Sequence, residues 1–247
     1  MKKNNQTSYS LTKFLSQAGI CARRKATELI KAGQVSVNDM IAKEPALQVT
    51  QDDCVRVNGK MVTFEEPVYI LMNKPDGVIT SVSDDHSRPT VMHVLGKHVH
   101  QRVYPVGRLD RPTTGVLLLT NDGELSQQLM HPKFGTEKVY HAELHRNLEP
   151  FDIRRVKQGV KLVDGVAAVD KLEFVPGKSR RQVLITLHNG KYRVIRRLFA
   201  QLGYTVKKLD RISFAGLTKK NLLPGAWRYM NKKEIENLKK CNVGQCC

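Results

Sequence analysis

The chain has 247 residues, enough for two modest domains or for one large domain that buries its own core. Its 41 Lys and Arg residues outnumber its 23 Asp and Glu residues, and the formal net charge of +18 predicts a polyanionic partner, nucleic acid before all others. A membrane surface is the weaker candidate, because the sequence has no run of roughly 18 or more apolar residues and no separate basic amphipathic helix.

The amino-terminal region begins with a polar segment and continues with two short helices. The start, MKKNNQTSYS, lacks the apolar stretch of a signal peptide, so we expect a cytoplasmic protein. Apolar residues recur at helical spacing over 11–18 and again over 23–32, and Gly19 and Gly33 follow as helix-ending residues. The start of the second helix carries the basic residues Arg23, Arg24 and Lys25.

Two strand-like segments, VSVND at 35–39 and VRVNG at 55–59, complete a small unit over residues 9–62. Taken alone, its basic cluster is most simply a solvated helix face. The order of two helices, each followed by glycine, and then a VxVN strand resembles the S4-type RNA-binding module, a small α/β domain. Ala22 stands where that module usually has a serine, so we expect the second helix to be capped less well.

A second, larger domain is predicted over residues 69–240. Residues 63–68, TFEEPV, form the predicted linker, because they are acidic, contain a proline and lack helical periodicity. Residues 241–247 form a predicted tail. Strand patterns outnumber helices without regular alternation, which favours an α+β fold around a mainly antiparallel mixed sheet. The strand patterns are VYILMN (68–73), GVLLLT (115–120), KVYHAEL (138–144) and QVLITLH (182–188), and the helical ones are GELSQQLMH (123–131) and YRVIRRLFAQLG (192–203).

No metal or cofactor site is predicted. Three of the five cysteines fall within 241–247 without a nearby histidine, so we expect reduced thiols. The eight histidines are scattered along the chain. The sequence also lacks G-x-S-x-G, H-E-x-x-H, a Walker glycine loop and a dinucleotide-binding glycine fingerprint.

An acid and a phenol are the first candidates for chemistry. GRLDRPTTGVLLLTNDG, residues 107–123, places Asp110 just before an apolar strand. An aspartate near Pro and Gly is most often a loop residue that accepts backbone hydrogen bonds, and a cap, an ion-pair partner or a catalyst are the alternatives. Tyr140 shares a predicted strand face with Ala142 and Leu144, where a plain core role is the commoner one.

Three arginines in NGKYRVIRRLF, residues 189–199, are the next candidates. Arg193 and Arg197 lie one predicted helical turn apart and can both face solvent or phosphate. Arg196 lies at the border of the buried stripe of this helix. A half-buried guanidinium needs a carboxylate partner, and Asp110 can provide it.

Four segments together carry a family resemblance: NKPDGVITS (73–81), GRLDRPTTGVLLLTNDGEL (107–125), EKVYHAEL (137–144) and NGKYRVIRRLF. They resemble the bacterial ribosomal RNA pseudouridine synthases that carry an S4-type module before the catalytic domain. The GRLD segment is long and specific, and the resemblance runs from about Leu11 to about Leu238. Tyr192, Arg193 and Val194 stand where the family often has asparagine, arginine and glutamine.

The resemblance implies an isomerase that converts a uridine of ribosomal RNA into pseudouridine without a cofactor. It implies a catalytic aspartate at Asp110, a catalytic arginine at Arg196 paired with it, and a catalytic tyrosine at Tyr140 against the target base. Arg108 matches the position that helps to flip the uridine out of its stack, a step that costs a few kcal/mol. Phosphate contacts are expected from Arg23, Arg24, Lys25, Lys74, Arg193 and Arg197.

The role of the acid and the choice between functions stay open at this point. Cleavage of a glycosidic bond builds positive charge on the sugar, and a carboxylate stabilises such charge. Asp110 can act as a nucleophile on the anomeric carbon or as a base at the neighbouring sugar carbon. The rival functions are a non-catalytic RNA-binding ribosome-assembly factor and, more weakly, a DNA-binding regulator. We expect a monomer and prefer large-subunit over small-subunit ribosomal RNA as the substrate.

Overall fold

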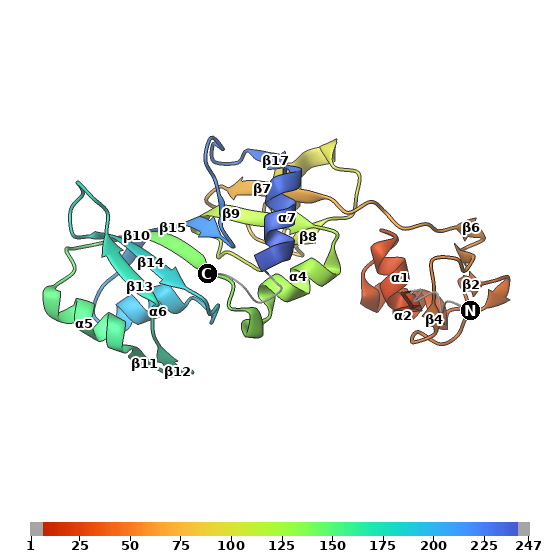
Figure 1. Ribbon diagram of the computed structural model, residues 1–247, viewed down its shortest axis with the longest axis horizontal. Helices are drawn as coiled ribbons and strands as arrows, with labels where there is room; N and C mark the ends of the chain where they lie inside the picture. The colour runs from red at the N-terminus through yellow and green to blue at the C-terminus, as the bar shows by residue number, and fades with distance from the viewer. Residues whose placement is uncertain (1–6, 242–247) are drawn as a thin grey trace. The chain divides into compact units, whose positions relative to one another are not determined.

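The computed structural model describes residues 7–241, and within them the chain forms two compact units (Figure 1). The first unit reaches Val68 and also includes Val99–Val103 and Asn121–Gly123, and the second starts at Tyr69. Residues 242–247, which make up most of the predicted tail, lie outside the described part. No helix within residues 7–241 is long and apolar enough to cross a membrane.

The first unit packs two helices against short antiparallel strands. Its helices lie where the apolar spacing predicts them, and Ala22 precedes the second helix without a side-chain cap bond, as expected. Four strands form a sheet in the order β3, β2, β5, β6, and β1 pairs with β4. These elements are α1 (Leu11–Gln17), α2 (Arg23–Lys31), β1 (Tyr9–Ser10), β2 (Val35–Val37), β3 (Met40–Ile41), β4 (Gln48–Val49), β5 (Val55–Val57) and β6 (Lys60–Met61).

Residues 63–68 have no regular secondary structure, but they are not free of the first unit. The Phe64 ring lies 4.6 Å from the Phe14 ring and 5.4 Å from the Tyr9 ring, measured between centroids. Phe64 therefore closes the core of the first unit.

The second unit is built on one large mixed sheet, which confirms the α+β prediction. Within residues 7–241 this sheet has nine strands, in the order β13-β14-β10-β15-β9-β7-β17, with β16 beside β15 and β8 beside β9. All of these pairings are antiparallel except that of β15 with β9. The bounds are β7 (Tyr69–Lys74), β8 (Tyr104–Pro105), β9 (Thr113–Thr120), β10 (Lys138–Leu144), β13 (Lys171–Phe174), β14 (Gln182–Leu187), β15 (Val206–Phe214), β16 (Leu217–Thr218) and β17 (Trp227–Tyr229).

Helices and a small hairpin complete the second unit. The helices are α3 (Val91–Leu95), α4 (Gly123–Met130), α5 (Pro150–Gln158), α6 (Val194–Gln201) and α7 (Lys232–Cys241), with 3₁₀ turns η1 (Gly96–His98) and η2 (Pro132–Phe134). The hairpin pairs β11 (Val160–Leu162) with β12 (Gly165–Ala167).

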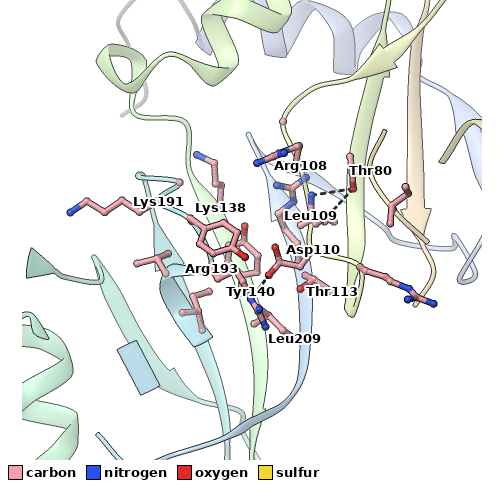
Figure 2. A pocket seen from close by; sticks show the side chains of 18 of the residues that line it. Thr80, Arg108, Leu109, Asp110, Thr113, Lys138, Tyr140, Lys191, Arg193 and Leu209 are labelled. Carbon is pink, nitrogen blue, oxygen red and sulfur yellow. Dashed lines mark hydrogen bonds and ion pairs between the residues drawn. The ribbon is translucent and has the colours of Figure 1, made fainter. Parts of the chain in front are cut away.

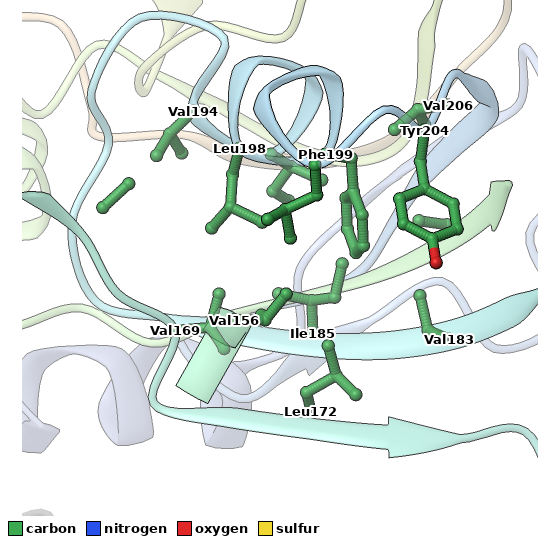
Figure 3. Packing of buried hydrophobic residues seen from close by; sticks show 14 of the residues in the cluster. Val156, Val169, Leu172, Val183, Ile185, Val194, Leu198, Phe199, Tyr204 and Val206 are labelled. Carbon is green, nitrogen blue, oxygen red and sulfur yellow. The ribbon is translucent and has the colours of Figure 1, made fainter. Parts of the chain in front are cut away.

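The helix α6 packs against the sheet through the apolar stripe that its sequence predicts. Leu198 and Phe199 are fully buried and lie over Ile185 and Val183 of β14 (Figure 3). The same cluster includes Ala142 and Leu209, from β10 and β15. Burial of such side chains stabilises the unit by about 1.5 to 3 kcal/mol each and fixes α6 relative to the strands beneath it.

Gly115 allows the parallel strands β9 and β15 to approach each other. Its φ of +109° is unfavourable for any residue with a Cβ atom, and a Cβ atom there would lie 2.2 Å from the carbonyl oxygen of Arg211. Since Gly115 lies two residues beyond Thr113, this contact sets the register of β15 against the start of β9.

We predict that Gly115→Ala lowers the free energy of unfolding by about 2 kcal/mol or more, through backbone strain and the clash with β15. Urea unfolding followed by circular dichroism measures this. Gly177→Ala is the matched control, because Gly177 also has a positive φ of +70° but open space around it. It should cost only about 1 kcal/mol. Equal losses in the two variants would contradict a special approach at Gly115.

Candidate active site

A cavity of about 840 Å³ opens on the second unit. Its floor consists of side chains from the sheet, among them Thr113 of β9, Tyr140 of β10 and Leu209 of β15. The register places Leu209 opposite Thr113, and Arg211 opposite Tyr140, so three strands that are distant in sequence meet there. Its rim consists of loop residues from 79–88, 107–111 and 189–193.

Asp110 lies at the rim, in the turn that leads into β9. Its carbonyl accepts a hydrogen bond of 3.0 Å from the Thr113 N–H, and its side chain is 31% exposed. The carboxylate points across the cavity toward Tyr140 (Figure 2). A turn residue with a backbone role would direct its carboxylate at its own loop, so the direction of this side chain favours a ligand.

The turn that carries Asp110 is held by buried donors on both sides. The Thr80 hydroxyl donates a hydrogen bond of 2.9 Å to the Leu109 carbonyl and accepts one of 3.2 Å from the Leu109 N–H. Lys74 donates to the carbonyls of Arg111 and Thr113 at 3.1 and 2.8 Å. These bonds fix the backbone before and after Asp110 and leave its carboxylate free to face the cavity.

The expectation that Lys74 contacts RNA phosphate is wrong. Its side chain is 0% exposed, and its third donor bond goes to the carbonyl of Pro75 at 3.0 Å. Burial lowers the pKa of the Lys74 ammonium to about 8. Lys74 is the last residue of the buried strand β7, and its buried ammonium donates its hydrogen bonds to carbonyls and not to phosphates.

The predicted ion pair between Asp110 and Arg196 is also replaced by another arrangement. Asp110 Oδ2 lies 3.4 Å from Nε of Arg193. Arg196 instead donates to the carbonyls of Val206 at 2.9 Å and Pro112 at 3.3 Å, while its Nε is buried without a partner. Burial, reinforced by the Arg193 charge, lowers the pKa of Arg196. Arg196 thus binds the backbone of the Asp110 turn and not its carboxylate.

Arg193 reaches Asp110 because it lies outside the helix. Its backbone is left-handed, with φ 46° and ψ 35°, and α6 begins only at Val194. Arg193 therefore precedes the helix in which the sequence pattern placed it. Arg197 is instead bound to Asp164, with Nη1 2.9 Å from Oδ2, so its charge is already compensated. Non-glycine residues in this backbone region cluster at functional sites, which suits Arg193.

Tyr140 and Arg108 both line the cavity. Tyr140 is half-buried on the cavity floor and packs against the cluster that includes Ala142 and Leu144, as strand alternation predicts. Arg108 is exposed at the rim and, within residues 7–241, has neither an ion pair nor a hydrogen bond through its side chain. It is therefore free to bind a ligand.

The basic residues predicted for RNA contact on the first unit are exposed. Arg23 and Arg24 open α2 on its solvent side, and Lys25 is exposed although it pairs with Glu28 at 2.8 Å. The buried residues of α2 are Ala26 and Ile30, on the opposite side.

The polar residues of the site that the sequence did not single out include Thr80, Thr113, Lys138 and Arg211. Lys138 carried a usable signal, because it precedes Tyr140 by two residues and strand alternation puts both on one face. Thr80 and Arg211 carried none, since one lies in an ordinary loop and the other in a strand without an apolar pattern. Within residues 7–241 no three His, Cys, Asp or Glu side chains are grouped to hold a metal ion.

Comparison with known proteins assigns both units to known families. The RNA pseudouridylate synthase family matches residues 68–201, and the S4 domain matches residues 11–55. Ribosomal large subunit pseudouridine synthase B of Bacillus subtilis is 40% identical to this chain over 233 residues, covering 93% of this chain and 95% of its own length.

A second relative and a solved structure agree with this match. Ribosomal small subunit pseudouridine synthase A of Vibrio cholerae is 35% identical over 231 residues, covering 92% of this chain and 98% of its own length. A crystal structure of a pseudouridylate synthase superposes with a TM-score of 0.66 at 29% identity, over 92% of this chain and 98% of the other.

The lowered pKa of Lys74 predicts a pH dependence of stability. Between about pH 8 and 10 the folded state has released this proton while the unfolded state still holds it, so the free energy of unfolding rises with pH. Lys138, whose pKa is also about 8, contributes in the same direction. Lys74→Met should reduce the rise of the free energy of unfolding with pH by up to about 1.4 kcal/mol per pH unit.

Urea unfolding at intervals from pH 7 to 10 measures this slope. Lys171→Met is the matched control, since its side chain is 62% exposed and its removal should leave the slope unchanged. A Lys74→Met slope equal to that of the wild type would show that the buried ammonium titrates normally.

Proposed function

Because the chain belongs to the RNA pseudouridylate synthase family and carries an S4 domain, it is an RNA pseudouridine synthase, and we propose that it modifies one uridine of ribosomal RNA. The observation that carries the site assignment is the turn of Asp110, which is held by buried donors so that its carboxylate faces a cavity floored by Tyr140. A pure RNA-binding factor would gain nothing from a carboxylate there, because it repels phosphate.

The reaction breaks the bond between the anomeric carbon of ribose and N1 of uracil, and joins the same carbon to C5. In our proposal the carboxylate of Asp110 stabilises the positive charge that develops on the sugar. It either forms a bond to the anomeric carbon or removes a proton from the neighbouring sugar carbon, and both routes need the same placement. The atoms of substrate and product are the same, so these steps need no co-reactant.

Arg193 and Arg196 divide the role that one arginine was expected to fill. Arg193 is the charged neighbour that orients the Asp110 carboxylate, and its exposed position lets it move when RNA enters. Arg196 acts through the backbone, since it binds the carbonyl of Pro112 beside the acid. We assign Arg193 as the charge partner and Arg196 as a positioning residue.

Tyr140 offers its ring as the surface on which the flipped uracil stacks. Its half-buried position on the floor, across from Asp110, leaves one face of the ring toward the cavity. Stacking of a base on an aromatic side chain contributes about 1 to 3 kcal/mol. The Tyr140 hydroxyl is our candidate relay for the proton that leaves C5, because it can accept that proton while it passes its own to solvent.

RNA is held by exposed cations on both units. At the rim Arg108 is unpaired within the described chain, and we propose that it enters the stack when the uridine leaves. Arg193 contacts the neighbouring phosphate once it separates from Asp110. On the S4 domain Arg23, Arg24 and Lys25 bind phosphates farther along the RNA. Arg197 contributes only if it leaves Asp164.

Between the two ribosomal RNAs we propose the large-subunit RNA as the substrate. The support is the higher identity to the large-subunit enzyme of Bacillus subtilis, 40% against 35% for the small-subunit enzyme of Vibrio cholerae. We further propose that the protein acts as a monomer in the cytoplasm, where ribosomal RNA is transcribed and assembled in bacteria.

We predict that Asp110→Asn abolishes pseudouridine formation and leaves RNA affinity within about twofold, because the amide keeps the shape but loses the charge. Cells that lack the gene receive either the wild type or the variant, and pseudouridines in both ribosomal RNAs are mapped by carbodiimide modification and primer extension. Loss of one site, restored by the wild type alone, names the uridine and its subunit. Restoration by Asp110→Asn would remove the acid from the mechanism.

The S4 domain should contribute electrostatic affinity. We predict that Arg23→Glu with Arg24→Glu weakens binding of the ribosomal RNA fragment and makes its dependence on salt shallower, because fewer counterions are released on binding. Fluorescence anisotropy across a salt series measures both effects. Lys43→Glu with Lys60→Glu changes the charge equally at exposed positions outside α2 and should have a smaller effect. Identical slopes in the two double variants would exclude a specific RNA contact on α2.

A further inference from the structure

The cavity floor contains polar groups that the roles above leave unused. Thr113, Lys138 and Arg211 come from β9, β10 and β15, and their exposed fractions are 2%, 8% and 2%. Within the described residues the Thr113 hydroxyl and Nη2 of Arg211 have no hydrogen-bond partner. Unpartnered buried polar atoms are rare in proteins, and their presence along a cavity points to a ligand that supplies the partners.

The two cations lie beside Tyr140 on the same sheet surface. Arg211 is the cross-strand partner of Tyr140, and Lys138 precedes Tyr140 by two residues on β10. Both approach the ring of Phe214, with Cζ of Arg211 4.6 Å and Nζ of Lys138 6.0 Å from its centroid. A base stacked on Tyr140 would therefore have both cations along its edge.

Within residues 7–241 neither cation forms an ion pair with a carboxylate, and Asp170 acts on Lys138 only as the least of three electrostatic influences. Lys138 donates to the carbonyls of Thr136 and His188, and Nε of Arg211 donates to the carbonyl of Val116. In the described chain neither makes an ion pair. Burial, with the Arg211 charge as a further cause, lowers the pKa of Lys138 to about 8. Two unpaired cations in one buried region are costly, and an anionic ligand removes that cost.

Their depth distinguishes a base from a phosphate. In the proposed binding mode the phosphates of the RNA stay at the rim, where Arg108 and Arg193 are exposed. Only a group that enters the cavity reaches a side chain that is 2% exposed, as Arg211 is. For the proposed reaction that group is the flipped uracil.

We propose that Arg211 and Lys138, with the Thr113 hydroxyl, bind the uracil after it leaves the sugar and stabilise its negative charge. This inference rests on the proposed placement of the uridine between Asp110 and Tyr140. When the bond from the anomeric carbon to N1 breaks, its electron pair stays on the ring and spreads over N1, O2 and O4. Both routes open to Asp110 pass through this anion.

The cationic floor also retains the base while it turns. The charge of the anion lies on oxygens at two sides of the ring, so the ring keeps a contact with a cation as C5 replaces N1 opposite the sugar. C5 then bonds to the anomeric carbon as the bond from that carbon to Asp110 breaks or, on the other route, as Asp110 returns its proton to the neighbouring sugar carbon. The proton on C5 then leaves, and N1 gains a proton. Arg211 and Lys138 take no part in the bond changes and act by charge alone.

The test compares two leaving groups in single-turnover reactions on the ribosomal RNA fragment that contains the target uridine. One substrate carries uridine and the other 5-fluorouridine, whose less basic uracil anion needs less stabilisation. Arg211→Met should slow cleavage of the glycosidic bond about 100-fold for uridine and less than about 10-fold for 5-fluorouridine, as expected for loss of one donor to a developing anion. RNA affinity should stay within about twofold.

Three further variants separate this role from a structural one. Arg211→Lys keeps the charge and should recover most of the rate, and Lys138→Met should show the same dependence on the leaving group. Lys208→Met on the same strand β15, where the side chain is 83% exposed, should match the wild type. Thermal unfolding checks the fold of each variant. If Arg211→Met does not fold, the single variants Lys138→Met and Arg211→Lys decide the comparison.

The outcomes distinguish this inference from the proposed function. Equal losses on the two substrates, or a loss confined to RNA affinity, would overturn the cationic floor while the wild type still forms pseudouridine. Failure of the wild type to convert uridine in any ribosomal RNA fragment would instead overturn the proposed substrate.

Discussion

The active site depends on one constraint, the immobilisation of the short turn that presents Asp110. Thr80, Lys74 and Arg196 come from a loop, a strand end and a helix, and each donates to a carbonyl of that turn. Backbone carbonyls next to an acid would otherwise turn toward water and take the acid with them. With those carbonyls bound from beneath, the carboxylate is the remaining acceptor that faces the cavity. The fold therefore positions the acid through its neighbours, and the arginine next to it remains free to respond to RNA.

Charge at the site is sorted by depth. Exposed arginines such as Arg108 and Arg193 stand at the rim, where solvent screens them and phosphates can reach them. Buried cations stand on the floor, where each is costly. The carboxylate of Asp110 lies between the two layers. This arrangement suits a substrate that is anionic along its backbone, becomes cationic at the sugar during the reaction, and carries negative charge on the detached base.

The sequence predicted the segments with periodic apolar patterns and the residues within them. The strands at 138–144 and 182–188 and the helix over 23–32 appear close to their expected limits, because alternation or helical spacing of apolar residues determines burial. It did not predict β15, whose sequence VKKLDRISF mixes charges with apolar residues and reads as no pattern. That strand is central because its neighbours bury it, which is a tertiary effect. The contacts of Lys74, Arg193 and Arg196 were not predicted, for a related reason. Periodicity places a side chain on a face of a helix or strand. The local backbone decides whether a residue at a helix start is left-handed and which carbonyl accepts from a buried donor.

The missed strand explains why the sheet is mixed. A wholly antiparallel sheet would pair β9 with a sequence neighbour, and the floor beside Tyr140 would then come from nearby segments. The parallel join of β9 with β15 brings Arg211 from the far end of the domain to the strand that begins just after Asp110. Gly115 makes that join possible, since a Cβ atom there would meet the backbone of Arg211 itself. The same glycine that lets two strands close thus sets where the floor cation lies relative to the acid, and a change that loosens the join would disturb both the acid and the base-binding surface. Stability and chemistry are coupled here through the backbone.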